Sequence, residues 1–465
     1  MTDRDWLREM ERRGLTRRAF VKGGLASAGA LSLGGLLAAC GGDDDDDAAP
    51  GDTGGDNGEA PQFTGTLRVT GLGVDLIDPI REAAEAALGF SLAFDVTDTV
   101  TGRNKVITQP DSLDIFSGYF NDIDQIWPSG NMIPVETSRI TRWSEVTSLY
   151  KTGRVNPDSS DCSLGDGDAP FRKMYTTEDG EITTWADPDS GEVSGDEPQY
   201  VTMSGGNFNM DSMGYNAEEI QLEPDEVNWD QLFNPEYRGR VAILNDPSIG
   251  MQDVGNAAVQ AGIMQFEDLG NMTREEIDQL IQVCLDLKRQ GHFRAFWTTF
   301  DESVNLMASG EVVIESMWSP AVSLLQAQGH PTRYAAPSGG FRGWAGGMGI
   351  MGHVAEDPSK LKACYDYLNW WHEGEAGAIM MRQGYYNVVQ ETSREYVSED
   401  EWNFWIDGQA APEALDSPFG EESIAEGLVR DGGSFVDRAC NYSSWNSLMD
   451  EQEHQVERWN EFLAA

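Results

Sequence analysis

The thiol of Cys40 stands in a context that favours covalent lipid attachment. It ends the sequence Leu-Ala-Ala-Cys (residues 37–40), which has the form of a lipobox. In that motif the cysteine is acylated and becomes the first residue of the mature chain, so the protein is held at a membrane surface. The sequence therefore predicts Cys40 as a lipidation site.

An export signal precedes that cysteine. Arg17 and Arg18 lie within Thr-Arg-Arg-Ala-Phe-Val-Lys, a twin-arginine pattern, and an apolar run over 23–39 follows it. The run is rich in Gly, Ala and Ser and is shorter than the ~20 strongly apolar residues that a membrane-spanning helix needs. We therefore interpret residues 1–39 as a cleaved signal peptide for export of the folded protein. The alternative is an uncleaved membrane anchor.

Residues 40–62 are predicted to form a disordered acidic tether. They contain five consecutive Asp residues at 43–47 and otherwise mostly Gly, Ala, Asp, Asn and Pro, a composition that cannot bury enough apolar surface to fold. No later apolar segment is long enough to span a membrane. We expect the remaining chain to stand off the outer face of the cytoplasmic membrane, at the cell surface or in the periplasm.

The chain is strongly acidic, with 79 Asp and Glu against 32 Lys and Arg, a formal net charge of −47. Because the acids are spread along the whole chain, we interpret them as the hydrated surface of a protein from a halophile; the alternative is a site for cationic substrates. No basic patch is available to meet phosphates, which argues against a nucleic-acid partner. At ~1 M salt the Debye length is about 3 Å, so only groups in direct contact with a ligand would attract it.

Four cysteines follow Cys40, and an even number in an exported protein allows one or two disulfides. Cys284 and Cys364 lie in helical contexts with apolar faces, which predicts buried free thiols. Cys162 and Cys440 lie in loop-like contexts and are the candidate pair. The sequence alone leaves the pairing open.

Strands and helices alternate along the body, which predicts an α/β fold with a mostly parallel sheet. Expected strands cover 67–70, 90–96, 113–116, 241–244, 312–318 and 347–354. Expected helices cover 79–88, 253–261, 274–290, 301–309, 360–371, 375–383 and 445–463. Residues 117–120 are expected in a loop at the end of a strand, where ligands bind in such sheets.

The last expected helix carries a stripe of large side chains at helical spacing. We expect this stripe to pack against the body rather than to bind a partner. Its members are Trp445, Met449, Gln452, Val456, Trp459 and Leu463.

Several segments in order give the chain a recognisable pattern. They include LDIFSGYFNDIDQI (113–126), DSMGYNAEEI (211–220), LMASGEVVIESMWSPA (306–321), PSGGFRGWAGGMGIM (337–351) and RQGYYNVV (382–389). This pattern resembles the extracellular solute-binding proteins of ABC importers, in particular the spermidine/putrescine-binding family. The resemblance implies a bilobal, periplasmic-binding-protein-like fold of type II. Two α/β lobes would close by hinge strands on a small ligand, without catalysis, and deliver the ligand to permease subunits.

On that resemblance, residues 63–203 with 345–385 are expected to form lobe 1 and residues 204–344 lobe 2. Residues 386–465 are expected to form a C-terminal region that packs on the lobes. We expect a monomer with no cofactor and no metal.

The resemblance also assigns candidate ligand residues. Ser117 and Tyr119 match the ligand loop of the first lobe, Trp318 the aromatic residue at the end of a second-lobe strand, and Trp344 and Tyr385 the late aromatic positions. Aromatic faces suit a polyamine, because they flank its methylene chain and attract its ammonium groups.

The acids that a polyamine needs match less well. Asp246 is the one acid in the second-lobe turn, and Gly346 stands where the family has a carboxylate. Asp211, Asp301 and Glu302 are the remaining candidates. Arg342, two residues before Trp344, would instead suit a carboxylate or phosphonate. An anionic or zwitterionic solute therefore stays open as the alternative ligand.

Other chemistries have weaker signals. The glycines of 347–352 fit G-x-G-x-x-G, but they are expected within a strand and do not open a helix as a dinucleotide site requires. The adjacent Tyr385 and Tyr386 resemble a tyrosine pair of ferric-ion-binding proteins. An iron site would need further ligands, however, and the five His residues show no metal-ligand spacing. An anchored extracellular enzyme is the alternative of another class, and it would need a nucleophile and base brought together by the fold.

We expect Cys40→Ser to remove the lipid anchor while leaving export intact. The substituted protein should leave the membrane fraction, which fractionation of cells followed by immunoblotting measures. An unchanged membrane fraction would contradict the assignment of Cys40 as the lipidated residue.

Overall fold

The computed structural model describes residues 63–156 and 162–465 of the chain. The predicted signal peptide with Arg17 and Arg18, the tether and Cys40 lie outside the described residues. Within the described ranges, no helix is long and apolar enough to cross a membrane. The compact unit covers Ala60–Ala465.

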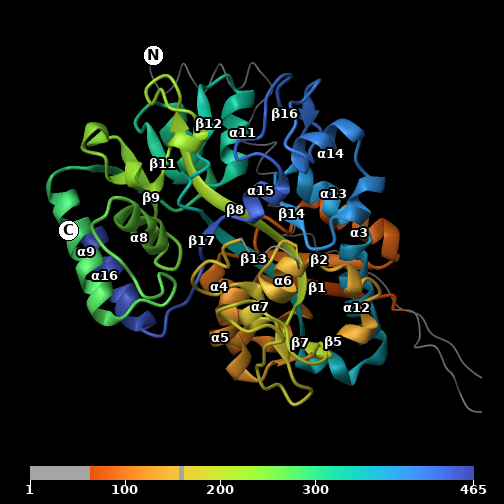
Figure 1. Ribbon diagram of the computed structural model, residues 1–465. Coiled ribbons are helices and arrows are strands. Elements are labelled where there is room, and N and C mark those ends of the chain that lie inside the picture. The colour runs from red at the N-terminus through yellow and green to blue at the C-terminus, as the bar shows by residue number, and fades with distance from the viewer. Residues whose placement is uncertain (1–62, 157–161) are drawn as a thin grey trace, which may run out of the picture. The chain divides into compact units, whose positions relative to one another are not determined.

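A 12-stranded sheet runs through this unit, with β8 and β13 at its centre (Figure 1). Its main path is β10-β9-β11-β8-β13-β3-β1-β2. In chain order these strands are β1 (Thr66–Gly71), β2 (Ser91–Val96), β3 (Ile115–Tyr119), β8 (Ser204–Asn216), β9 (Val241–Leu244), β10 (Phe293–Trp297), β11 (Ile314–Met317) and β13 (Phe341–Met351).

Short strands complete this sheet and form two small ones. β4 (Met132–Ile133), β12 (Thr332–Tyr334), β14 (Tyr386–Asn387) and β17 (Tyr442–Trp445) pair with β8 or β13. A second sheet has the order β5-β7-β6, formed by Val135–Glu136, Tyr200–Val201 and Tyr175–Thr176. A third joins β15 (Leu415–Asp416) to β16 (Glu422–Ile424).

The helices lie around the central strands (Figure 1). Those that precede residue 250 are α3 (Asp78–Leu88), α4 (Thr99–Thr108), α5 (Ile123–Ile126), α6 (Ser148–Thr152) and α7 (Pro170–Lys173). The later ones are α8 (Gly250–Gln260), α9 (Arg274–Arg289), α10 (Phe300–Ala308), α11 (Ser319–Ala327), α12 (Pro358–His372), α13 (Glu375–Arg382), α14 (Glu399–Trp405), α15 (Phe435–Ala439) and α16 (Gln452–Ala464).

The long strand β8 connects two separate hydrophobic cores. β8 contributes Phe208 and Met210 to a core built around β1, β2 and β3, and Met213 and Tyr215 to a core built around β9, α8 and α9. Strands are parallel within each half, as in β1–β2 and β9–β10, whereas β8 and β13 pair antiparallel. Parallel strands with covering helices are typical of α/β lobes. The predicted bilobal α/β fold is confirmed.

Helix α9 shows how the sequence specifies an element of the second half. Thr273 accepts a hydrogen bond from the Glu276 backbone N–H and forms a capping box with that residue. The last turn carries Lys288 and Arg289, which favour the negative end of the helix dipole. The buried face recurs at spacings of three and four residues, through Ile277, Leu280, Ile281, Cys284 and Leu285.

The predicted helix over 445–463 is wrong at its start. Trp445 ends strand β17, which pairs with β13, and α16 begins only at Gln452. Val456 is 37% exposed, so it does not belong to the packed stripe, and the buried face of α16 is Gln455, Trp459 and Phe462. The helical spacing from Trp445 to Trp459 is coincidental, because the residues between β17 and α16 form a non-helical connection.

Two smaller differences concern the strands that carry candidate site residues. Ser117 and Tyr119, expected in a loop, lie within β3. The strand expected over 347–354 runs over Phe341–Met351, so it includes Arg342 and Trp344 as well as most of the glycine pattern. Gly343 and Gly346 lower the strand propensity of the first half of β13, so the sequence pattern indicated only its second half as a strand.

Cys162 and Cys440 form a disulfide across 278 residues of sequence, while Cys284 and Cys364 are buried free thiols. The disulfide ties the segment before α7 to the segment that follows α15. The same two segments are hydrogen bonded, because the Ser163 N–H donates to the Cys440 carbonyl at 3.1 Å.

We expect the double substitution of Cys162 and Cys440 by Ser to lower the free energy of unfolding by about 2–5 kcal/mol, since closing a long loop restricts the unfolded chain. Denaturant titration of the full chain in molar salt measures this loss. A reducing agent should destabilise the unsubstituted chain by a similar amount and leave the double variant unchanged. Equal stability of the two proteins would contradict this role of the disulfide.

Candidate ligand-binding site

Three aromatic rings from separate elements meet around Trp344. The centroid of the Trp344 ring lies 5.4 Å from that of Tyr119 and 5.4 Å from that of Tyr385, in edge-on contacts. β3 pairs with β13, opposing Tyr119 to Gly346, which brings Tyr119 beside Trp344. Tyr385 follows α13, and its N–H donates to the Met380 carbonyl at 3.0 Å. We call Tyr119, Trp344 and Tyr385 the ring trio; these are three of the residues that the sequence predicted for the ligand.

Asp75 lies beside the ring trio and was not among the predicted residues. It is 3% exposed, in the turn that follows β1. The Ser117 hydroxyl donates to Asp75 Oδ2 at 2.7 Å, and Asp75 Oδ1 has no hydrogen-bond partner among the described residues. Its charge raises the pKa of the Tyr119 and Tyr385 phenols, after the larger effect of burial. Ser117 therefore acts here through Asp75.

Burial raises the pKa of Asp75 to about 6, and the neighbouring Ser117 hydroxyl and Asn207 side chain oppose that rise. Within the described ranges, no Lys, Arg or His forms an ion pair with Asp75. A buried carboxylate without a cationic partner is costly unless a ligand supplies one. The signal in the sequence was only positional, since an Asp that follows the first parallel strand lies where such sheets bind ligands.

Arg342 is fully buried and already paired. Its Nε donates to Asp253 Oδ1 at 2.7 Å and its Nη1 donates to Asn446 Oδ1 at 2.6 Å. Its Nη2 lies 3.8 Å from Asp211 Oδ2, across the β8–β13 pair. Two carboxylates and an amide thus use the guanidinium that an anionic ligand would require. Arg342 is therefore a buried structural cation in this arrangement.

Asp211 lies on β8 and is fully buried. Neither of its carboxylate oxygens has a hydrogen-bond partner among the described residues. Burial raises its pKa to about 6; Arg342 opposes this rise and the neighbouring charge of Asp253 adds to it. Asp211 also raises the pKa of the Tyr385 and Tyr119 phenols, so its charge acts on the ring trio.

The other predicted residues lie in different surroundings. Trp318 precedes α11 and packs edge-on against Trp297, with 5.1 Å between ring centroids, and parallel to Phe300 at 6.5 Å. Asp246 Oδ1 accepts hydrogen bonds from the N–H and hydroxyl of Ser248 within one turn. These side chains are not brought into the ring trio.

The two remaining acids lie on α10. Glu302 caps the first turn of this helix by accepting hydrogen bonds from the Thr298 and Thr299 N–H groups, and Asp301 is exposed in the same turn.

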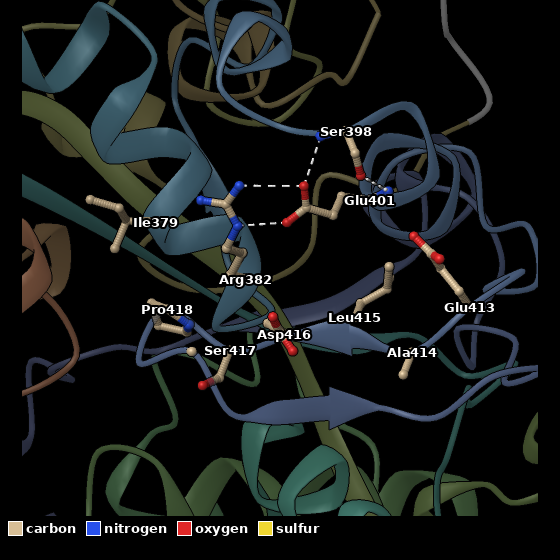
Figure 2. A pocket seen from close by; sticks show the side chains of 11 residues that line it. Ile379, Arg382, Ser398, Glu401, Glu413, Ala414, Leu415, Asp416, Ser417 and Pro418 are labelled. Carbon is tan, nitrogen blue, oxygen red and sulfur yellow. Dashed lines mark hydrogen bonds and ion pairs between the residues drawn. The ribbon is translucent and has the colours of Figure 1, made fainter.

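A pocket of about 450 Å³ lies in the C-terminal region and contains none of the predicted ligand residues. Figure 2 shows the Arg382 guanidinium facing the Glu401 carboxylate there, with hydrogen bonds of 2.5 and 3.3 Å. Glu413 and Asp416 line the same pocket. Because Arg382 and Glu401 satisfy each other, this pocket presents no unpaired buried group, unlike the surroundings of the ring trio.

The surroundings of Tyr386 do not favour an iron site. Tyr386 lies in β14 with its ring packed on Phe435 and Phe208, at centroid distances of 4.8 and 5.6 Å. In the part of the chain that the structure describes, no group of three or more His, Cys, Asp or Glu side chains could hold a metal ion.

Comparison with solved structures shows the same fold in solute-binding proteins. The substrate-binding protein of a spermidine/putrescine ABC transporter from Streptococcus pneumoniae aligns with a TM-score of 0.53 and 14% identity, over 86% of this chain and 99% of that chain. An ABC transporter substrate-binding protein from Bradyrhizobium japonicum aligns with a TM-score of 0.52 and 13% identity, over 86% and 100%.

A third structure, MotA from A. tumefaciens in complex with glucopine, aligns with a TM-score of 0.50 and 12% identity, over 85% and 99% of the two chains. No curated protein sequence matches this chain. A family model described as bacterial extracellular solute-binding protein matches residues 178–404. Residues 178–404 are therefore similar to the bacterial extracellular solute-binding proteins, and the described chain has the fold of the substrate-binding proteins of ABC transporters.

Proposed function

We propose that this protein is the lipid-anchored substrate-binding component of an ABC importer and that it captures a small organic cation. A polyamine such as spermidine or putrescine is the solute that the resemblance favours. The observation that carries this proposal is Asp75, a buried carboxylate beside the ring trio that has no cationic partner among the described residues.

The physical argument rests on what each group needs. A buried carboxylate needs a positive charge with hydrogen-bond donors, and an ammonium group supplies both. Tyr119, Trp344 and Tyr385 offer ring faces and edges against which methylene groups can pack, and aromatic faces attract ammonium groups. Packing alone explains clustered rings, but it does not explain why an unpaired acid is buried beside them.

An anionic or zwitterionic solute is less well supported. The cation nearest to the ring trio in sequence is Arg342, and Asp253, Asn446 and Asp211 already engage it. Solute-binding proteins of this fold include one complexed with glucopine and one that serves a spermidine/putrescine transporter, so the fold itself accommodates different small solutes. The charge around the ring trio is what favours a cation in this chain.

The remaining parts of the proposal concern place and partners. Export by the twin-arginine route, acylation of Cys40 and the acidic tether would hold a monomeric body at the outer face of the membrane, beside its permease. The lobes would divide at residues 204 and 345, the first at the start of β8 and the second within β13. The acidic surface suits a halophile, in which binding must work in strong salt.

Isothermal titration calorimetry in molar salt tests the ligand class. The full chain should bind putrescine or spermidine and should not bind succinate at the same concentrations. Trp344→Ala should weaken polyamine binding by about tenfold, the loss expected for a desolvated cation–π contact of ~1–2 kcal/mol. Trp127, whose indole N–H donates to the Gly180 carbonyl, provides the control, and Trp127→Ala should leave the affinity unchanged. Succinate binding without polyamine binding would contradict the proposal.

The affinity should also depend on pH in a defined direction. The pKa values of Asp75 and Asp211 are each about 6 and are raised from 3.8, so both carboxylates are charged above pH 7 and become neutral as the pH falls through 6. A cation binds the charged forms, and an amine ligand keeps its proton throughout this range. We expect affinity for putrescine to fall by about tenfold per required carboxylate between pH 8 and pH 5. An affinity that rises toward pH 5 would contradict a carboxylate-lined cation site.

A further inference from the structure

Two arginines of the C-terminal region are buried without a carboxylate partner. Arg430 is 7% exposed and Arg438 is 1% exposed. Among the described residues, neither guanidinium group forms an ion pair with an Asp or Glu side chain. A buried cation without a counter-charge is costly, so this arrangement calls for an explanation. The need is greater in a chain that has 79 acids available and only 32 basic residues.

The carboxylates that act on Arg438 are already shared with other arginines. Asp211 and Asp431 both feel the charge of Arg438, which opposes the rise that burial causes in their pKa. Asp431 Oδ1 lies 3.1 Å from Arg333 Nη2, and Asp211 Oδ2 lies 3.8 Å from Arg342 Nη2. Neither acid is therefore available to neutralise Arg438.

The hydrogen bonds of the two guanidinium groups go to neutral backbone carbonyls. The acceptors are those of Trp405 and Gly384 for Arg430, at 2.9 and 3.0 Å, and those of Asp431 and Met210 for Arg438, at 2.7 and 3.0 Å. Burial lowers the pKa of Arg430 to about 10, and the charge of Arg438 adds to this effect. The two positive charges thus lie close enough to repel each other.

Three buried hydrogen-bond donors in the same neighbourhood lack an acceptor. Arg438 Nε and the hydroxyl groups of Tyr386 and Tyr442 have no hydrogen-bond partner among the described residues. The two tyrosines are 1% and 2% exposed. Buried polar atoms are almost always hydrogen bonded, and an arginine Nε can only donate. An acceptor is therefore the group that would satisfy all three.

Packing brings these donors together from three elements that lie around the central strands (Figure 1). Phe435 and Arg438 are three residues apart on α15 and share one side of that helix, and the Phe435 ring lies 4.8 Å from the ring of Tyr386 on β14. The Arg438 guanidinium lies over the Phe341 ring at 4.9 Å, and Phe341 is opposite Tyr442 in the β13–β17 pair. Burial raises the pKa of the Tyr442 phenol, and the nearby charge of Arg438 opposes that rise.

We propose that Arg438 Nε and the hydroxyl groups of Tyr386 and Tyr442 bind a small monovalent anion, a halide such as chloride, between α15 and the central strands. Arg430 and Arg438 supply the balancing positive charge. A halide accepts hydrogen bonds from several directions and is compact enough for so enclosed a position. A water molecule could also accept these bonds, but it would leave both positive charges uncompensated. The inference does not depend on which solute the ring trio binds.

The anion would join α15, β14 and β17, so the stability of the full chain should depend on chloride itself. Denaturant titrations at constant ionic strength, with sodium chloride replacing sodium gluconate, measure this dependence. Above the dissociation constant, each tenfold increase in chloride should raise the ratio of folded to unfolded chain by about tenfold. Equal stability in the two salts would overturn the site.

Tyrosine-to-phenylalanine variants test the named donors, because they remove a hydroxyl group and keep the packed ring. Tyr386→Phe and Tyr442→Phe should each shift the chloride dependence to about tenfold higher concentration, the loss expected for a hydrogen bond to a charged group. Tyr367→Phe is the matched control, since the Tyr367 hydroxyl is also buried and without a partner among the described residues but lies on α12. This control should keep the full chloride dependence.

Crystals grown in sodium bromide locate the anion directly. We expect an anomalous-scattering peak within hydrogen-bonding distance of Arg438 Nε and of both hydroxyl groups, and its loss in the Tyr386→Phe/Tyr442→Phe double variant. A peak only at the protein surface would show adventitious halide and overturn the site. A chloride dependence that persists unchanged in the folded double variant would overturn it too.

Discussion

The antiparallel pairing of β8 with β13 is the constraint on which the rest of the structure depends. Strand β8 is long enough to serve two cores, contributing Phe208 to one and Met213 to the other, and β13 contributes its apolar side chains to the first of these cores. The register of this pair sets Asn209 opposite Trp344 and Asp211 opposite Arg342. A shift by one residue would turn the polar face of β8 into an apolar core and would place Phe208 and Met210 at the ring trio. The same register thus maintains both the packing and the chemistry of the site.

This pairing also brings charged side chains together in the protein interior, where unpaired charges are costly. Arg342, Asp211 and Asp253 are buried together, and Asp75 is buried nearby without a cation. Buried charges seldom increase stability, because desolvation offsets their mutual attraction. Their presence at the junction of two lobes is consistent with a site that is completed by a charged solute. In strong salt, contact charges of this kind remain effective whereas the many surface acids are screened.

The sequence predicted the fold and the aromatic part of the site more completely than the charged part. Alternating strands and helices, and the order of segments such as 306–321 and 337–351, were sufficient for a bilobal α/β protein. Tyr119, Trp344 and Tyr385 were found because rings at those positions belong to the resemblance. Asp75 was missed because one acid among 79 carries no local signal, and only the 2.7 Å contact with Ser117 sets it apart. The sequence also could not predict the ion-pair partner of Arg342, because Asp253 lies 89 residues away on α8.

Long-range contacts likewise explain the error at the C-terminus. Trp445 has helical spacing to Met449 and Trp459, yet β17 pairs with β13 and takes Trp445 out of the helix. A crystal structure of the protein with putrescine in molar salt tests the central claim most directly. We predict one ammonium nitrogen within hydrogen-bonding distance of Asp75 Oδ1 and the methylene chain against Trp344. Putrescine bound elsewhere, with the ring trio unchanged and Asp75 still unpaired, would contradict this interpretation of the site.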